Sequence, residues 1–167
     1  MNQKYRNLIM WALYAALFLA AVLAQTTVFG RVRFYDVKLS ILPITMVCIG
    51  MQTDHEAAGL FGLLAGLCWF AFGAEDGTLS IVTLPAAGIL AGWLCDNLFS
   101  RRLLPALLLS LGALALHEGA LFVIRFYLGS VPGALAQWVP KTVIMSLAVT
   151  PVIFLLSRLI RKAGVSN

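Results

Sequence analysis

The stretch that covers residues 57–74 reads AAGLFGLLAGLCWFAFGA, and none of its eighteen side chains is charged. An uncharged apolar run of this length is sufficient for a helix that crosses a lipid bilayer. Gly59, Gly62 and Gly66 are spaced i, i+3 and i+7, so they share one face of that helix. Because small residues let helices approach closely within lipid, we expect this face to pack against another helix.

The whole chain has the composition of an integral membrane protein. Of its 167 residues, 61% are hydrophobic and 11% are charged, whereas soluble domains are roughly half apolar and about a quarter charged. This composition excludes an ordinary cytosolic enzyme, a disordered regulator and a nucleic-acid-binding domain. The net charge of +5 comes from lysines and arginines scattered in ones and twos, which is typical of membrane flanks. We therefore expect an all-α integral membrane protein with one polytopic domain over residues 1–167 and no nucleic-acid partner.

Charged and turn residues divide the chain into six apolar runs, which we interpret as six transmembrane helices. Their approximate bounds are residues 7–30, 39–53, 57–74, 78–95, 103–127 and 141–159. The second run has only fifteen residues, with Pro43 near its start, so it is tilted, locally thins the bilayer, or is re-entrant. The first run also resembles a cleavable signal peptide that ends at Ala24, but the rest of the chain is equally apolar, which favours a span.

The basic residues of the loops favour a cytoplasmic location for both termini. Six spans place both termini on one side of the membrane, and that side carries seven lysines and arginines against five on the other. The first set is Lys4, Arg6, Arg101, Arg102, Arg158, Arg161 and Lys162, and the second is Arg31, Arg33, Lys38, Arg125 and Lys141. An excess of Lys and Arg marks the cytoplasmic side. A five-span arrangement without residues 39–53 would put eight basic residues inside and the N-terminus outside, so this alternative stays open.

A second face of small residues lies in residues 78–95. Gly88 and Gly92, with Ala87 and Ala91 beside them, recur at helical spacing. Such a face either packs against another helix of the same chain or docks another membrane protein. The spacing alone does not separate these two roles.

Three ionisable residues in the fifth run and one polar residue in the first need an explanation, since a charge within a membrane must face a partner, water or the protein interior. Glu118 and Arg125 share a helix face but lie about 10 Å apart along its axis, too far for a direct pair. Glu118 therefore makes an internal hydrogen bond, a partner contact, or a ligand or proton site, while Arg125 can snorkel to the interface. Gln25 lies near the interface or hydrogen-bonds across helices. We select His117, Glu118, Arg125 and Gln25 as candidates for partner or ligand contact.

The chain carries none of the common catalytic or metal-binding motifs. It has no Walker A loop and no HExxH, GxSxG or CxxC motif. Cys48, Cys68 and Cys95 fall inside apolar stretches without metal-ligand spacing, so we interpret them as buried thiols. The sequence thus predicts no enzyme activity, no catalytic residue, no cofactor and no metal site.

Over residues 8–128 the chain resembles the MreD family of rod-shape-determining membrane proteins. The matching elements are Ala24-Gln25-Thr26, Asp36 before the run with Pro43, the glycine-spaced residues 58–67, the turn at Gly77 that leads into residues 87–94, and Leu98-Phe99-Ser100-Arg101-Arg102. MreD sequences commonly have an aspartate soon after the glycine-rich stretch, where this chain has Cys68 and Trp69. No functional residue is therefore carried over from the family.

This resemblance implies a non-enzymatic scaffold of the machinery that builds the lateral cell wall and supports rod shape. It also implies a location in the bacterial cytoplasmic membrane. The implied partners are an MreC-like single-span protein, the elongation glycan polymerase and transpeptidase, the MreB cytoskeleton and membrane lipid.

The MreD fold is similar to that of the six-helix substrate-binding subunits, or S components, of energy-coupling-factor vitamin transporters. This similarity supplies an alternative function. An S component would bind a small vitamin or metal in a cavity that His117, Glu118 or Arg125 could line. The outer segment at residues 128–140 is mostly Gly, Pro, Ala and Leu, which disfavours a polar ligand.

Overall fold

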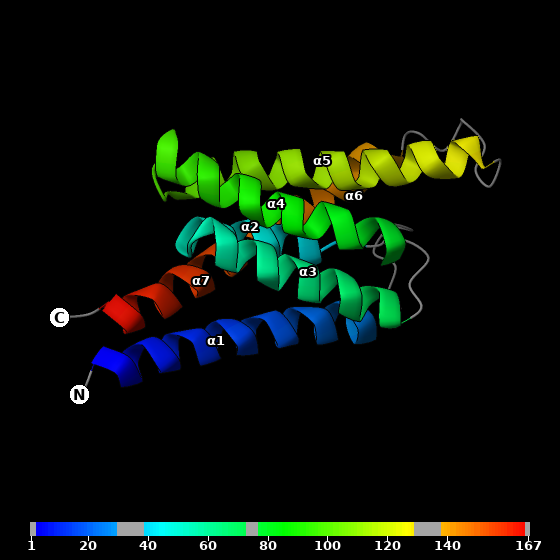
Figure 1. Ribbon diagram of the computed structural model, residues 1–167. Helices are drawn as coiled ribbons and strands as arrows, with labels where there is room; N and C mark the ends of the chain where they lie inside the picture. The colour runs from blue at the N-terminus through cyan, green and yellow to red at the C-terminus, as the bar shows by residue number, and fades with distance from the viewer. Residues whose placement is uncertain (1–2, 30–38, 73–76, 129–137, 166–167) are drawn as a thin grey trace.

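The computed structural model describes residues 3–29, 39–72, 77–128 and 138–165, and all regular structure within these ranges is helical (Figure 1). The elements in chain order are α1 (Gln3–Ala24), a π-helix η1 (Gln25–Phe29), α2 (Leu42–Gln52), α3 (His55–Ala71), α4 (Gly77–Asn97), α5 (Leu103–Tyr127), α6 (Trp138–Leu147) and α7 (Thr150–Val165). Residues 30–38, which include Arg31, Arg33 and Lys38, lie outside the described residues. Residues 129–137, most of the predicted outer segment, also lie outside them.

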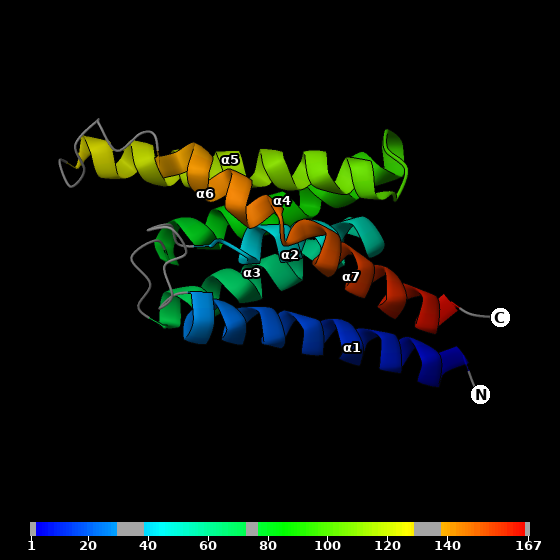
Figure 2. The same ribbon diagram turned by 180° about the vertical axis from the view of Figure 1, so that it is seen from behind.

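The helices form one elongated bundle, and α1 begins at the same end of it at which α7 ends (Figures 1 and 2). Figures 1 and 2 show α1 at one edge, α5 at the other and α2 between them. The α6–α7 pair runs back from the far end of α5 toward the end of the bundle where α1 begins. We call this end the terminal end and the other the distal end.

Helix α2 is the centre of the bundle. All of its residues from Leu42 to Gln52 are buried, and it packs against α3, α4, α5, α7 and α1. Its sequence has no polar face, as expected of a helix enclosed on every side. With eleven residues it is about 16 Å long, which is about half of the hydrocarbon thickness of a bilayer. The run at 39–53 is thus helical over residues 42–52 and enclosed by other helices, and a full span at this position is not confirmed.

Helices α3 and α4 make the closest pair, and the predicted small residues lie between them. A Cβ atom on Gly62 would be 2.5 Å from Pro85 Cα, and one on Gly66 would be 2.6 Å from Ile81 Cα. A Cβ on Gly59 would be 2.8 Å from the Ile89 side chain. Since backbone atoms cannot give way as the end of a flexible side chain can, Gly62 and Gly66 hold the two helices at a distance that only glycine permits.

The small residues of α4 also face inward, toward neighbouring backbone. A Cβ on Gly88 would be 2.9 Å from the carbonyl oxygen of Ala58, and one on Gly92 would be 3.0 Å from His55 Cα. A Cβ on Gly50 of α2 would collide with the carbonyl oxygen of Gly88. The five glycines predicted to pack helices thus join α3 and α4 to each other, and α4 also to α2.

The described helices support a multi-pass membrane protein, but six full spans are not confirmed. Three helical segments are long and apolar enough to cross a bilayer: Asn7–Thr27, Gly77–Asn97 and Leu103–Tyr127. The bent pair Val139–Leu147 and Thr150–Lys162 would make a fourth span. The expected span at 141–159 is thus two helices with a 42° bend, located just before Pro151, a residue type that commonly breaks helices. Helix α3, with 17 residues, falls short of the usual length.

We expect Gly62→Ala to destabilise the protein by about 1–3 kcal/mol, because the added methyl meets the backbone of α4. Gly112 of α5 is the matched control, since a Cβ at that position has nothing within 4 Å. Gly112→Ala should be neutral or stabilise the helix by up to about 1 kcal/mol. Equilibrium unfolding in mixed detergent micelles measures both, and equal effects would contradict the proposed backbone contact.

Candidate functional site

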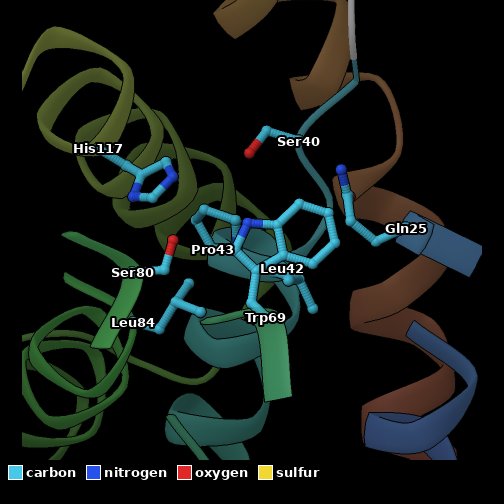
Figure 3. A pocket seen from close by; sticks show the side chains of 8 residues that line it. All are labelled: Gln25, Ser40, Leu42, Pro43, Trp69, Ser80, Leu84 and His117. Carbon is cyan, nitrogen blue, oxygen red and sulfur yellow. The ribbon is translucent and has the colours of Figure 1, made fainter. Parts of the chain in front are cut away.

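A small polar pocket lies among the helices at the start of α2 (Figure 3). Its lining side chains come from η1, the segment before α2, and helices α2, α3, α4 and α5. They are Gln25, Ser40, Leu42, Pro43, Trp69, Ser80, Leu84 and His117. The cavity measures about 20 Å³, which is room for about one water molecule.

Gln25 holds the chain that enters α2. Its side chain is 6% exposed; Nε2 donates to the carbonyl oxygen of Leu39, and Oε1 accepts from the backbone N–H of Ile41, both at 2.8 Å. A carboxamide can make both bonds because it carries a donor and an acceptor on one planar group. Gln25 is also the residue at which α1 becomes the π-helix η1, a local change that is frequent at functional positions.

The residue between these two contacts is held from another helix. The backbone N–H of Ser40 donates to Oγ of Ser146 in α6 at 2.9 Å. Residues 39–41 are not helical, so the N–H groups of Ser40 and Ile41 and the carbonyl group of Leu39 have no partner within a helix. Within lipid such groups must be satisfied by the protein itself, and Gln25 and Ser146 provide three of the bonds.

His117 forms the opposite wall of the pocket and is 3% exposed. Its Nδ1 lies 2.7 Å from Oγ1 of Thr83, and the Thr83 hydroxyl donates to the carbonyl oxygen of Leu79 at 3.1 Å. The Thr83 hydroxyl therefore connects the His117 ring to the backbone of α4. The imidazole is thereby oriented by α4, although it belongs to α5.

Figure 3 shows the indole of Trp69 across the middle of the pocket, with Ser80 and His117 on one side and Gln25 on the other. Nothing in the sequence pattern singled out Ser40, Ser80 or Thr83, because isolated Ser and Thr are common in membrane helices. Each of these residues is a single polar residue in an apolar run. Such residues are too frequent in membrane helices to identify a site.

The structure brings together two of the four residues predicted for partner or ligand contact. Gln25 and His117 line the same pocket although they are far apart in the sequence. Glu118 and Arg125 are partly buried on α5 but are not among the lining residues. Neighbouring residues on a helix point about 100° apart, which separates Glu118 from His117.

The pocket is suited to orienting polar groups within the bundle. In the described ranges no group of three or more His, Cys, Asp or Glu side chains could hold a metal ion. Cys48, Cys68 and Cys95 are free thiols. The polar atoms around the cavity are a carboxamide, hydroxyls, an imidazole and an indole, which together can hold one water and fix the entry of α2.

No protein-family model, no curated protein and no solved structure matches this chain. The assignment of function therefore depends on the residues and their geometry.

We expect Gln25→Glu to destabilise the protein at neutral pH by about 1–3 kcal/mol, because a carboxylate oxygen would then face the carbonyl oxygen of Leu39 in place of a donor. As the pH falls, the introduced carboxyl group takes up a proton and can donate again, so stability should recover in acid. Thermal unfolding in detergent as a function of pH measures this. Thr27→Val is the control, since the exposed Thr27 hydroxyl bonds only within its own turn. A pH-independent loss in Gln25→Glu would contradict the donor role.

Proposed function

We propose that this chain is a non-enzymatic scaffold of the MreD kind in the bacterial cytoplasmic membrane. In this role it binds an MreC-like single-span protein and supports the elongation glycan polymerase and transpeptidase, together with the MreB cytoskeleton, in lateral wall synthesis. Its chain forms six membrane segments, of which α2 is a short one enclosed by the bundle, and its fold is similar to that of an S component. The sequence resemblance over residues 8–128 supports this proposal.

The observation that favours a scaffold over a vitamin-binding S component is the size of the cavity at the start of α2. Its volume is about 20 Å³, whereas pockets for small molecules usually measure about 300–1,000 Å³. A vitamin would need α2 to move away from α4, to which glycine contacts join it closely. The alternative keeps one supporting feature, which is that Gln25 and His117 face the same cavity.

The outer faces of α1 and α5 are consistent with function through surface contacts. Both helices expose large apolar side chains, among them Leu19 at 54%, Leu108 at 60% and Leu116 at 68%. In a membrane these faces meet lipid or the helix of another protein. The partly buried Glu118 and Arg125 lie on α5, so this helix remains our candidate for the partner contact.

The distribution of charge supports cytoplasmic termini. Basic residues in the described elements at or near the terminal end are Lys4, Arg6, Arg101, Arg102, Arg158, Arg161 and Lys162, and those at or near the distal end are Arg125 and Lys141. An excess of Lys and Arg favours the cytoplasmic side. We therefore place the terminal end in the cytoplasm.

Affinity purification of the full chain from native membranes in mild detergent tests the proposal, with mass spectrometry as the readout. We expect recovery of an MreC-like single-span protein and cell-wall synthases, enriched over an unrelated multi-pass bait of similar abundance. Recovery of a pair of ATPases with a coupling membrane subunit would instead assign the chain to the vitamin transporters.

The role of Glu118 can be measured in the same experiment. If it makes an ionic contact with the partner, Glu118→Gln should lower partner recovery by about tenfold, since hydrogen bonds to charged groups contribute about 1.5–3 kcal/mol. Glu56→Gln is the matched control, because Glu56 is exposed in the first turn of α3. Equal recovery with both variants would show that the charge of Glu118 is not used in partner binding.

A further inference from the structure

An arginine points into the bundle at the terminal end of α7. The buried stripe of this helix includes Thr150, Phe154 and Ser157, and Arg161 extends it by one turn at the i+4 position. The Tyr14 hydroxyl of α1 donates to the carbonyl oxygen of Ser157 at 3.2 Å, which fixes this stripe against α1. Arg161 is partly buried, in contrast to its exposed neighbours on the same helix, Arg158 and Lys162.

The Arg161 guanidinium has far more donors than acceptors around it. It carries five N–H groups, and its one hydrogen bond with the described residues goes to Oε1 of Gln52 at 3.5 Å. The described chain places no carboxylate within 4 Å of it, and the ion pair at this end joins Asp96 to Arg101 at 2.7 Å. Asp54, Asp96, Tyr14 and Arg101 act on Arg161 only through longer-range electrostatic interactions.

Gln52 behind it presents a second unsatisfied donor. Its side chain closes the terminal end of α2 and is 6% exposed, and its Nε2 is buried without a hydrogen-bond partner among the described residues. A buried donor without an acceptor costs about 1–3 kcal/mol, and more where a charge is involved. Arg161 and Gln52 thus form a pair of adjacent donors, and the partly exposed Arg161 is the one that an acceptor with negative charge can reach from outside the bundle.

The position of this pair indicates where such a group comes from. It lies toward the terminal end of the bundle (Figure 2). At this end α1 begins, α7 ends, and α2 is followed by α3. At the end of a membrane bundle the abundant anions with several oxygen atoms are phospholipid phosphates, and basic pockets between membrane helices bind them. Arginine suits this ligand because its planar donors match two phosphate oxygens.

We propose that Arg161, supported by Gln52, binds the phosphate of one anionic phospholipid at the terminal end of the bundle. Arg161 is the residue that lipid can reach, and Gln52 orients it from behind. This site requires only a multi-pass membrane protein and stands apart from the proposed scaffold function, so either proposal can fail without the other.

The test uses the full chain purified in detergent and freed of lipid, to which phosphatidylglycerol or phosphatidylcholine is added. Native mass spectrometry counts the lipids retained, and thermal unfolding measures stabilisation. We expect one phosphatidylglycerol to be retained in preference to phosphatidylcholine and to raise Tm. Arg161→Gln should weaken its binding by about tenfold or more, whereas Arg158→Gln, three residues away and exposed, should not. Equal losses in both variants would overturn the site and indicate only a diffuse basic surface.

A second variant keeps the proposal testable if Arg161→Gln fails to fold. Gln52→Glu supplies an internal carboxylate beside Arg161, so it should raise the Tm of the lipid-free protein and abolish the preference for phosphatidylglycerol. An unchanged preference would contradict the assigned ligand residues. Glycerol phosphate, added alone, separates the two sources of the anion, and stabilisation equal to that by the whole lipid would overturn the lipid assignment.

Discussion

The carboxamide of Gln25 meets the main chain on both sides of Ser40, and the central position of α2 depends on this contact. A chain that enters a lipid-embedded bundle without helical structure carries N–H and C=O groups that water cannot satisfy. Gln25 provides a donor and an acceptor at 2.8 Å each, and Ser146 provides another acceptor. With those groups satisfied, α2 can begin deep in the bundle as a short helix, whereas an unsatisfied entry would favour a longer helix exposed to lipid.

A central helix with no polar face then requires close neighbours. Gly50 and Gly88 allow α2 and α4 to meet backbone to backbone, and Gly62 and Gly66 allow the same between α3 and α4. This packing leaves only about 20 Å³ at the polar start of α2. The same residues that make the bundle compact therefore restrict what this cavity can hold.

Polar side chains in the described interior bond mostly to backbone groups, and among the few buried polar atoms without a partner, Nε2 of Gln52 is the one that belongs to a side chain bonded to a charged group. The walls of the pocket pair Gln25 with backbone and His117 with Thr83. At the terminal end, Arg161 and the Nε2 atom of Gln52 are both donors with too few acceptors in the described chain. The first arrangement connects helices through satisfied hydrogen bonds. The second lacks acceptors for its donors, and a phosphate of the membrane surface would supply them to Arg161.

The sequence by itself determined the membrane class, the helical fold and the bounds of α5, which coincide with the predicted run at 103–127. These properties depend on hydropathy and on helical spacing, and both are local. Only the tertiary structure decided that the run at 39–53 is a short enclosed helix and that the run at 141–159 is bent. It also decided that Gln25 and His117 share a pocket that excludes Glu118. Such outcomes depend on contacts between residues far apart in the sequence, for example Gln52 and Arg161, which are 109 residues apart. A local sequence pattern does not identify which distant residue a side chain will contact.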